Sequence, residues 1–172
     1  MNDSNYASIL DYVKGGQIIS TSGFSGYGVG LVDGNDNLAG STVSANTIEV
    51  AYTLEGDANL DGKVDATDFG IFAPNFGLST TLGWEVGDFN YDGKVDATDF
   101  GLFAPNFGLS DTGTALSLPA ADYAALDAFA AANGLSLTSV PEPASLGLLT
   151  LGAVGILARR RKGSKISVHK EK

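Results

Sequence analysis

The chain has 172 residues and a formal net charge of −10, from 10 Lys and Arg against 20 Asp and Glu. Seven of the basic residues lie at or after Arg159, so the first 158 residues are strongly acidic and would be repelled by the phosphates of nucleic acid, which excludes that partner. The chain has no cysteine and one histidine, His169 in the basic tail, which excludes disulfides, Cys and His zinc sites and Ser-His-Asp catalysis in the acidic part.

Residues 1–55 predict a strand- and Gly-rich segment, which we interpret as the end of a larger upstream domain. A helical pattern over residues 2–16 is followed by Gly- and Ser-rich sequence over residues 17–40, which predicts loops and short strands. Apolar residues alternate over residues 48–54 and predict a strand. The start has no basic stretch followed by an apolar run, as a secretory signal would, and we therefore expect the chain to be a fragment of a longer protein.

An internal repeat is the most informative feature of the sequence. Residues 56–79 read GDANLDGKVDATDFGIFAPNFGLS, and residues 87–110 repeat this block, 31 residues later, with three differences. A period of this length indicates one supersecondary unit that is used more than once. Two copies predict a pseudo-symmetric pair.

Each repeat contains the pattern D-x-N-x-D-G-x-V-D-x-x-D, which has the ligand spacing of a twelve-residue calcium loop. Such a loop binds the ion through carboxylate and amide oxygens and one backbone carbonyl, which Lys63 and Lys94 would provide. The first set of predicted ligands is Asp57, Asn59, Asp61, Lys63, Asp65 and Asp68, and the second is Asp88, Asn90, Asp92, Lys94, Asp96 and Asp99. Two calcium ions are therefore expected. The run Asp-Gly-Asn-Asp-Asn at residues 33–37 begins similarly but has no closing acid, and we interpret it as a turn.

The segments that flank each calcium loop predict a helix after the loop and no helix before it. Residues 66–76 and 97–107 place Phe at i, i+3 and i+7, which predicts helices that Pro74 and Pro105 interrupt or kink. The segments before the loops have no helical periodicity, unlike an EF-hand. Val64 and Val95 are expected to pair in a short β-bridge between the loops.

The remaining sequence predicts a linker and an anchor. Residues 111–139 form a linker with one helix over residues 119–133. Residues 140–163 contain an apolar run before four basic residues, which predicts a transmembrane helix with its C-terminus in the cytoplasm, and residues 164–172 are a basic tail. The alternative is a buried helix that ends in a basic tail.

Residues 56–110 resemble a type I dockerin domain, because two calcium loops are each followed by a helix. The resemblance implies two calcium ions and, as in cellulosomes, a cohesin-like or other surface protein as partner. It places partner recognition at Ala66, Thr67, Ala97 and Thr98. The usual pair at these positions is Ser-Thr, and the Ala-Pro-Asn-Phe segments replace a basic, Leu-rich helix end, so calcium binding carries over better than cohesin binding.

The C-terminus resembles a PEP-CTERM sorting signal of Gram-negative bacteria. The residues that carry this resemblance are Pro141, Glu142 and Pro143 before the apolar run, and Arg159, Arg160 and Arg161 after it. The resemblance implies cleavage near the Pro-Glu-Pro site by an exosortase. Together the two motifs are similar to the C-terminal part of secreted surface proteins of planctomycete-type bacteria.

These observations predict a mostly α module of two loop-helix F-hand units, preceded by strands and followed by a linker helix and a transmembrane helix. The predicted function is a non-catalytic calcium-binding attachment module of an exported, envelope-sorted protein. It would pass through an inner-membrane intermediate with a cytoplasmic C-terminus before reaching the cell surface. The alternative is the C-terminal part of a polysaccharide hydrolase with an upstream catalytic domain. The chain itself is not expected to be an enzyme, since calcium accounts for most clustered carboxylates.

Overall fold

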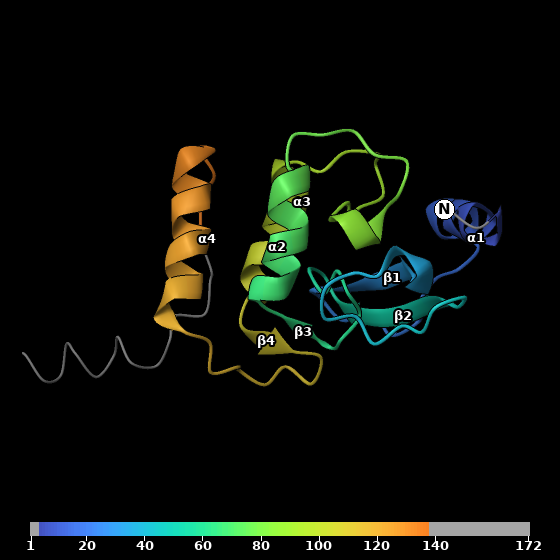
Figure 1. Ribbon diagram of the computed structural model, residues 1–172, viewed down its shortest axis with the longest axis horizontal. Coiled ribbons are helices and arrows are strands. Elements are labelled where there is room, and N and C mark those ends of the chain that lie inside the picture. The colour runs from blue at the N-terminus through green and yellow to red at the C-terminus, as the bar shows by residue number, and fades with distance from the viewer. Residues whose placement is uncertain (1–3, 138–172) are drawn as a thin grey trace, which may run out of the picture. The chain divides into compact units, whose positions relative to one another are not determined.

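The computed structural model describes residues 4–137, which all belong to one compact unit. It begins with helix α1, Ser4–Lys14, followed by the antiparallel strands β1, Tyr27–Asp33, and β2, Ile48–Leu54 (Figure 1). The β1–β2 register pairs Tyr27 with Leu54 and Asp33 with Ile48. A short 3-10 helix, η1, Gly34–Asp36, turns the chain after β1.

The repeats form two loop-helix units. In the first, strand β3, Lys63–Val64, leads into helix α2, Ala66–Asn75. The connection to the second contains the 3-10 helix η2, Trp84–Val86, and the second unit has helix α3, Ala97–Phe103, the 3-10 helix η3, Ala104–Asn106, and strand β4, Leu109–Ser110. Pro74 lies within the last turn of α2, whereas α3 gives way to the 3-10 helix at the residue before Pro105.

The two units exchange backbone hydrogen bonds reciprocally. Val64 pairs with Leu109 in the β3–β4 sheet, and the Gly108 N–H donates to the Val64 carbonyl at 2.8 Å. At the equivalent place in the other repeat, the Gly77 N–H donates to the Val95 carbonyl at 2.7 Å. The loop of each repeat thus pairs with the segment after the other repeat's helix. The predicted Val64–Val95 bridge is wrong, because each valine pairs instead with the segment that follows the other repeat's helix.

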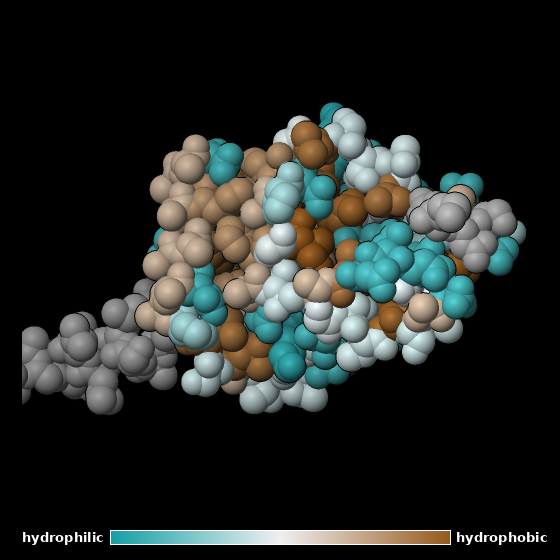
Figure 2. All heavy atoms as spheres, viewed as in Figure 1, coloured by the Kyte–Doolittle hydropathy of each residue, from teal (hydrophilic) through white to brown (hydrophobic). Residues whose placement is uncertain are grey.

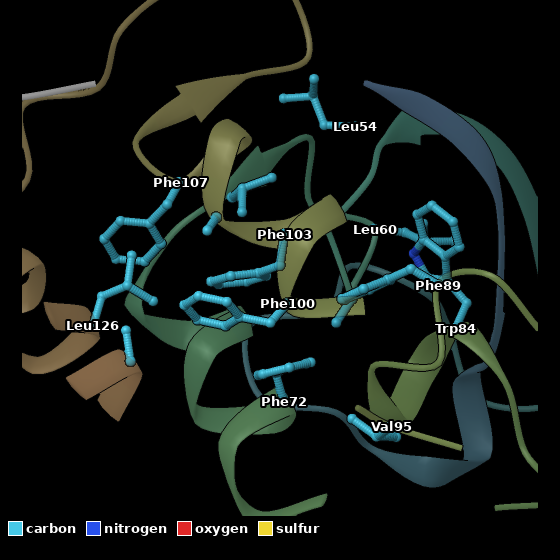
Figure 3. Close-up of a cluster of buried hydrophobic side chains, with 14 of the residues drawn as sticks. Leu54, Leu60, Phe72, Trp84, Phe89, Val95, Phe100, Phe103, Phe107 and Leu126 are labelled. Atoms are coloured by element: carbon cyan, nitrogen blue, oxygen red, sulfur yellow. The ribbon is translucent and has the colours of Figure 1, made fainter. Parts of the chain in front are cut away.

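Aromatic rings from both repeats form the core (Figure 3). Phe72 and Phe103 occupy equivalent positions, are fully buried, and stack at 5.4 Å between ring centroids. Phe89 stacks on the same pair at 6.2 and 6.3 Å, and Trp84 meets the Phe89 ring edge-on at 5.1 Å. The core therefore extends from the helices to the connection between them and to β1.

Helix α4, Ala120–Ala132, lies where the sequence predicts a helix and packs on the repeats. Leu126 and Ala130 belong to the same buried cluster as the repeat aromatics, and Phe129 contacts the Phe76 ring at 5.1 Å. The outer face of α4 consists mostly of alanine, so this side of the molecule is coloured apolar in Figure 2. Residues 120–132 thus contribute to the core of the calcium-loop pair.

The predicted fold class, mostly α, is wrong. The described residues contain four α-helices and are only about 38% helical, with two two-stranded sheets. The reason is that Pro105 shortens the second repeat helix, that the loops and connections hold much of the chain, and that β1 and β2 share the core. Within residues 4–137 no helix is long and apolar enough to cross a membrane. The segment predicted to do so, within residues 140–163, lies outside the described residues.

Candidate metal centres

The first loop is closed by hydrogen bonds from its own backbone to its acidic side chains. Asp57 accepts from the N–H groups of Asp61 and Gly62, both at 3.1 Å, through its two carboxylate oxygens. The Asn59 side-chain oxygen accepts from the Asp61 N–H at 2.9 Å, and Asp61 accepts from the Lys63 N–H at 3.0 Å. Gly62 has a φ of 83°, which only glycine adopts without strain. The first three predicted ligands, Asp57, Asn59 and Asp61, are therefore tied by hydrogen bonds to the backbone of one tight turn.

The second loop repeats this network. Asp88 accepts from the N–H groups of Asp92 and Gly93, both at 3.0 Å. Asn90 accepts from the Asp92 N–H at 2.8 Å, and Asp92 accepts from the Lys94 N–H at 3.0 Å. Two segments with different neighbours thus adopt the same backbone turn, which indicates that the shared sequence determines it.

The closing acids join the end of each loop to its beginning. Asp68 accepts from the N–H groups of Ala58 and Asp65, both at 2.9 Å, and of Asn59 at 3.3 Å. Asp99 makes the three equivalent bonds in the second loop. Asp65 and Asp96 accept from the second N–H of the helices that they precede, so each loop ends in a capping box.

Burial makes these carboxyls unusually hard to ionise in the absence of a cation. Asp57, Asp68, Asp88 and Asp99 are fully buried. Burial raises the pKa of Asp57 and of Asp99 to about 6, although hydrogen bonds from the loop oppose the shift, and it raises the pKa of Asp68 well above its ordinary value. Neighbouring carboxylates add to each rise. A bound cation would remove this cost, because it neutralises the like charges.

The donor set fits a hard cation. All side-chain donors are carboxylate or amide oxygens, which suit calcium. An ionised carboxylate has about four acceptor sites, so Asp57 and Asp68, which each accept three hydrogen bonds, retain one for an ion. As the side chains stand, no group of three or more acidic or His side chains within residues 4–137 is arranged to hold a metal ion. Binding therefore requires the partly exposed acids of each loop to turn inward.

The first loop is more enclosed than the second. The Thr53 hydroxyl donates to Asp57 at 2.5 Å, and the Asn59 side-chain amide donates to the Ala39 carbonyl at 2.9 Å. Asn59 is fully buried, whereas the equivalent Asn90 is exposed and its amide donates only to Asp92. Residues from outside the repeats thus cover one predicted site and leave the other open.

The predicted partner residues differ between the repeats for the same reason. Ala66 and Ala97 are exposed at the first position of their helices. Thr67 is half-buried, and its methyl group lies 3.1 Å from where a Cβ on Gly40 would be, whereas Thr98 is exposed. The sorting-signal residues, from Pro141 to Arg161, lie outside the part of the chain that the structure describes.

Sequence reasoning missed the residues that support the loops from outside. Thr53 lies on β2 four residues before the first predicted ligand, and nothing in the strand pattern distinguishes it. Trp84 donates its indole N–H to the Asp57 carbonyl. The sequence gives one signal for Trp84, which is that it is the only Trp of the chain.

Comparison with protein families gives two matches. Residues 55–103 match the dockerin type I domain, and residues 139–162 match the PEP-CTERM protein-sorting motif. No curated protein and no solved structure matches the chain. The two matches confirm the dockerin and PEP-CTERM resemblances and support a calcium-binding module in an exported, sorted protein.

Proposed function

We propose that residues 56–110 are a non-catalytic, calcium-stabilised attachment module that binds two calcium ions, one in each loop. The observation that carries this proposal is that both loops close through the same hydrogen bonds and end on a buried aspartate. The proposed ligands are those predicted from the repeat, with Lys63 and Lys94 contributing backbone carbonyls. Calcium is favoured over magnesium, because calcium accepts about six to eight oxygen ligands in a flexible geometry, whereas magnesium requires a strict octahedron. A flexible geometry suits two loops of which one is more buried than the other.

Calcium removal tests this proposal on the full chain. We expect chelator-stripped protein at pH 7 to lose part of its helical circular dichroism and part of the near-ultraviolet signal of its aromatic core, and calcium to restore both. The physical reason is that buried like charges repel, and a small core offsets this repulsion poorly. Magnesium at the same concentration is the control. Identical spectra with and without calcium would contradict the proposal.

We propose that the start of α3 is the docking face for a cohesin-like or other surface protein. Its exposed Ala97 and Thr98 are free of the neighbouring segment that approaches Thr67. Thr98→Asp should then abolish binding of the module to its surface-protein partner. The matched variant Thr67→Asp should weaken this binding less. Equal effects of the two variants would contradict this assignment.

We further propose that an exosortase-type protease processes the C-terminus near Pro141-Glu142-Pro143. A Pro-x-Pro sequence in general disfavours a regular helix and favours extended backbone, which suits a protease site. Expressed with a secretory signal in a host that has an exosortase, the protein should lose the residues after this site. A host that lacks the protease should retain them. An intact mass that ends at Lys172 in both hosts would contradict the processing.

The proposed division of the chain is the one expected from the sequence: an upstream part to residue 55, the module over residues 56–110, a linker over residues 111–139, the sorting signal over residues 140–163 and the basic tail. A catalytic domain of a polysaccharide hydrolase upstream is the alternative function. No observation among residues 4–137 favours it, and sequencing upstream of Met1 would test it.

A further inference from the structure

Strand β2 fixes the orientation of the first predicted ligand, Asp57. The Thr53 hydroxyl donates to Asp57 Oδ2 at 2.5 Å, and the same oxygen accepts from the Gly62 N–H at 3.1 Å. Among the described residues, the Asp61 N–H is the one donor to Asp57 Oδ1. A carboxylate oxygen accepts roughly two hydrogen bonds, so Oδ2 is saturated and Oδ1 is the oxygen left for an ion.

The second loop lacks this support. Trp84 stands where Thr53 stands in the first repeat, 31 residues later, and it has no hydroxyl. Its indole N–H donates to the Asp57 carbonyl, so Trp84 also supports the first loop. Asp88 Oδ2 accepts from the Gly93 N–H at 3.0 Å, and residues 4–137 provide it with no second donor. Asp88 is therefore held by its own loop, whereas Asp57 is held by its loop and by β2.

The connection between β1 and β2, residues 34–47, covers the first loop. Its Ala39 carbonyl accepts from the Asn59 side-chain amide at 2.9 Å. Gly40 has a φ of 75°, and a Cβ at this position would lie 2.7 Å from the Asn59 side-chain nitrogen and 3.1 Å from Thr67 Cγ2. Only glycine permits this close approach without strain. The connection thus fixes the amide of a second predicted ligand.

The matching asparagine of the second loop is exposed. The Asn90 side-chain amide donates to Asp92 at 3.1 Å, so one predicted ligand occupies an oxygen of another. Asp92 is itself exposed, whereas the corresponding Asp61 is half-buried. An ion that binds in the second loop has to order these exposed side chains, which costs conformational entropy.

We propose that β1, β2 and their connection make the two calcium ions unequal, so that the first loop binds its ion more tightly and releases it more slowly than the second. This inference rests on the proposed calcium binding by both loops. Thr53 and Ala39 are positioning residues, because they hold Asp57 and Asn59 in place before the ion arrives, and binding then orders fewer groups. When free calcium falls, the second loop empties first.

The residues responsible lie outside the family motif. Thr53 and Ala39 precede residue 55, at which the dockerin match begins. The ligand positions of the two loops carry the same residue types, so the repeat alone does not predict a difference between the ions. The strands before the repeats are therefore a functional part of the first calcium site.

Nuclear magnetic resonance of the full chain tests the order of release. The Gly62 and Gly93 N–H groups each donate to the first predicted ligand of their own loop, so their signals report the two ions separately. When a chelator is titrated into the calcium-loaded protein, the Gly93 signal should reach its metal-free position at about tenfold higher free calcium than the Gly62 signal, because Thr53 bonds a charged carboxylate. Simultaneous movement, or Gly62 first, would overturn the inference and leave binding of two ions intact. If neither signal responds to calcium, the proposed function fails and the inference fails with it.

Two variants with matched controls test the cause. Thr53→Val removes the hydroxyl at nearly constant shape and should weaken the first ion about tenfold, whereas Thr53→Ser keeps the hydroxyl and should retain the wild-type order. Gly40→Ala should speed release of the first ion, since the added Cβ pushes the connection away from Asn59. Gly23→Ala is its control, because Gly23 also has a positive φ, 56°, and nothing lies within 4 Å of its Cβ position.

Near-ultraviolet circular dichroism in excess calcium shows whether each variant is folded. If Thr53→Val does not fold, the exposed Gly40→Ala decides the question with Gly23→Ala beside it. Wild-type release of the first ion from Gly40→Ala and from a folded Thr53→Val would show that the strands do not contribute to the site, which would overturn the inference.

Discussion

The indole nitrogen of Trp84 donates a hydrogen bond of 2.6 Å to the backbone carbonyl of Asp57, the first predicted ligand of the first loop. Trp84 is fully buried, and the indole fits against β1 because Gly28 and Gly30 have no side chains there. A Cβ at Gly30 would lie 2.9 Å from the indole nitrogen. The connection before the second loop thus supports the backbone of the first loop.

Trp84→Phe should weaken calcium binding by the first loop. The substitution removes the only Trp, leaves the Asp57 carbonyl without this donor and creates a cavity, which together should lower the free energy of unfolding by about 2–4 kcal/mol. Calorimetric titration should show one weakened site. Tyr91→Phe is the control, since it removes the hydrogen bond from Tyr91 to the Val29 carbonyl without touching Asp57. Equal calcium affinities in both variants would refute the link.

The closing acid of each loop should matter more than the acid three residues before it. Asp68 is fully buried and accepts three backbone N–H groups, whereas Asp65 is half-buried and accepts the Thr67 N–H at 2.7 Å. Asp68→Asn should weaken the first site by about 100-fold or more and Asp65→Asn by about tenfold, since the ninth position often acts through water. Titration calorimetry of both variants, and of the pair Asp99→Asn and Asp96→Asn, measures this. The reverse order would contradict the ligand assignment.

Stability should depend on pH in opposite directions with and without calcium. The pKa of Asp57 and of Asp99 is raised from 3.8 to about 6 in the folded, metal-free chain, so the folded state binds more protons than the unfolded state over this range. The free energy of unfolding then falls as pH rises from 3.8 through 6. Between pH 5 and pH 7 the metal-free melting temperature should drop by roughly 5 °C.

Saturating calcium should reverse this trend, because protons compete with the ion for the same carboxylates. Scanning calorimetry at four pH values, in chelexed buffer and in excess calcium, compares the two states. Asp57→Asn and Asp99→Asn should each flatten the metal-free curve. A metal-free melting temperature that rises from pH 5 to pH 7 would show that these acids are ionised in the fold.

The sequence predicted local features of this fold better than its long-range contacts. The strand at Ile48–Leu54 and the helix near residues 119–133 follow from alternation and periodicity, and the structure confirms both. The loop ligands remain a prediction from spacing. Three long-range contacts depend on tertiary packing, and no local sequence pattern predicts them. They are the pairing of Val64 with Leu109, the hydrogen bond between Asp33 and Glu85, and the hydrogen bond from Trp84 to Asp57.

Asn106 shows how near-identical repeats acquire different roles. Its side-chain amide donates to the carbonyls of Glu55 at 2.7 Å, Gly26 at 3.1 Å and Leu102 at 3.2 Å, so it attaches the second repeat to the strands. The equivalent Asn75 donates only to Ile71, within its own helix, at 2.8 Å. Within four residues on either side the two sequences differ only at Ile71 and Leu102, so the difference comes mainly from what packs against each asparagine.

Asn106→Ala should therefore lower the free energy of unfolding by about 1–3 kcal/mol, since it leaves the half-buried Glu55 carbonyl without its donor. Asn75→Ala removes the same side chain from the equivalent position and should cost less than about 1 kcal/mol. Urea unfolding in saturating calcium measures both without a contribution from ion loss. Since the two substitutions are chemically the same, equal losses would mean that Asn106 stabilises only its own helix end, and that the strands are held to the repeats by the apolar core.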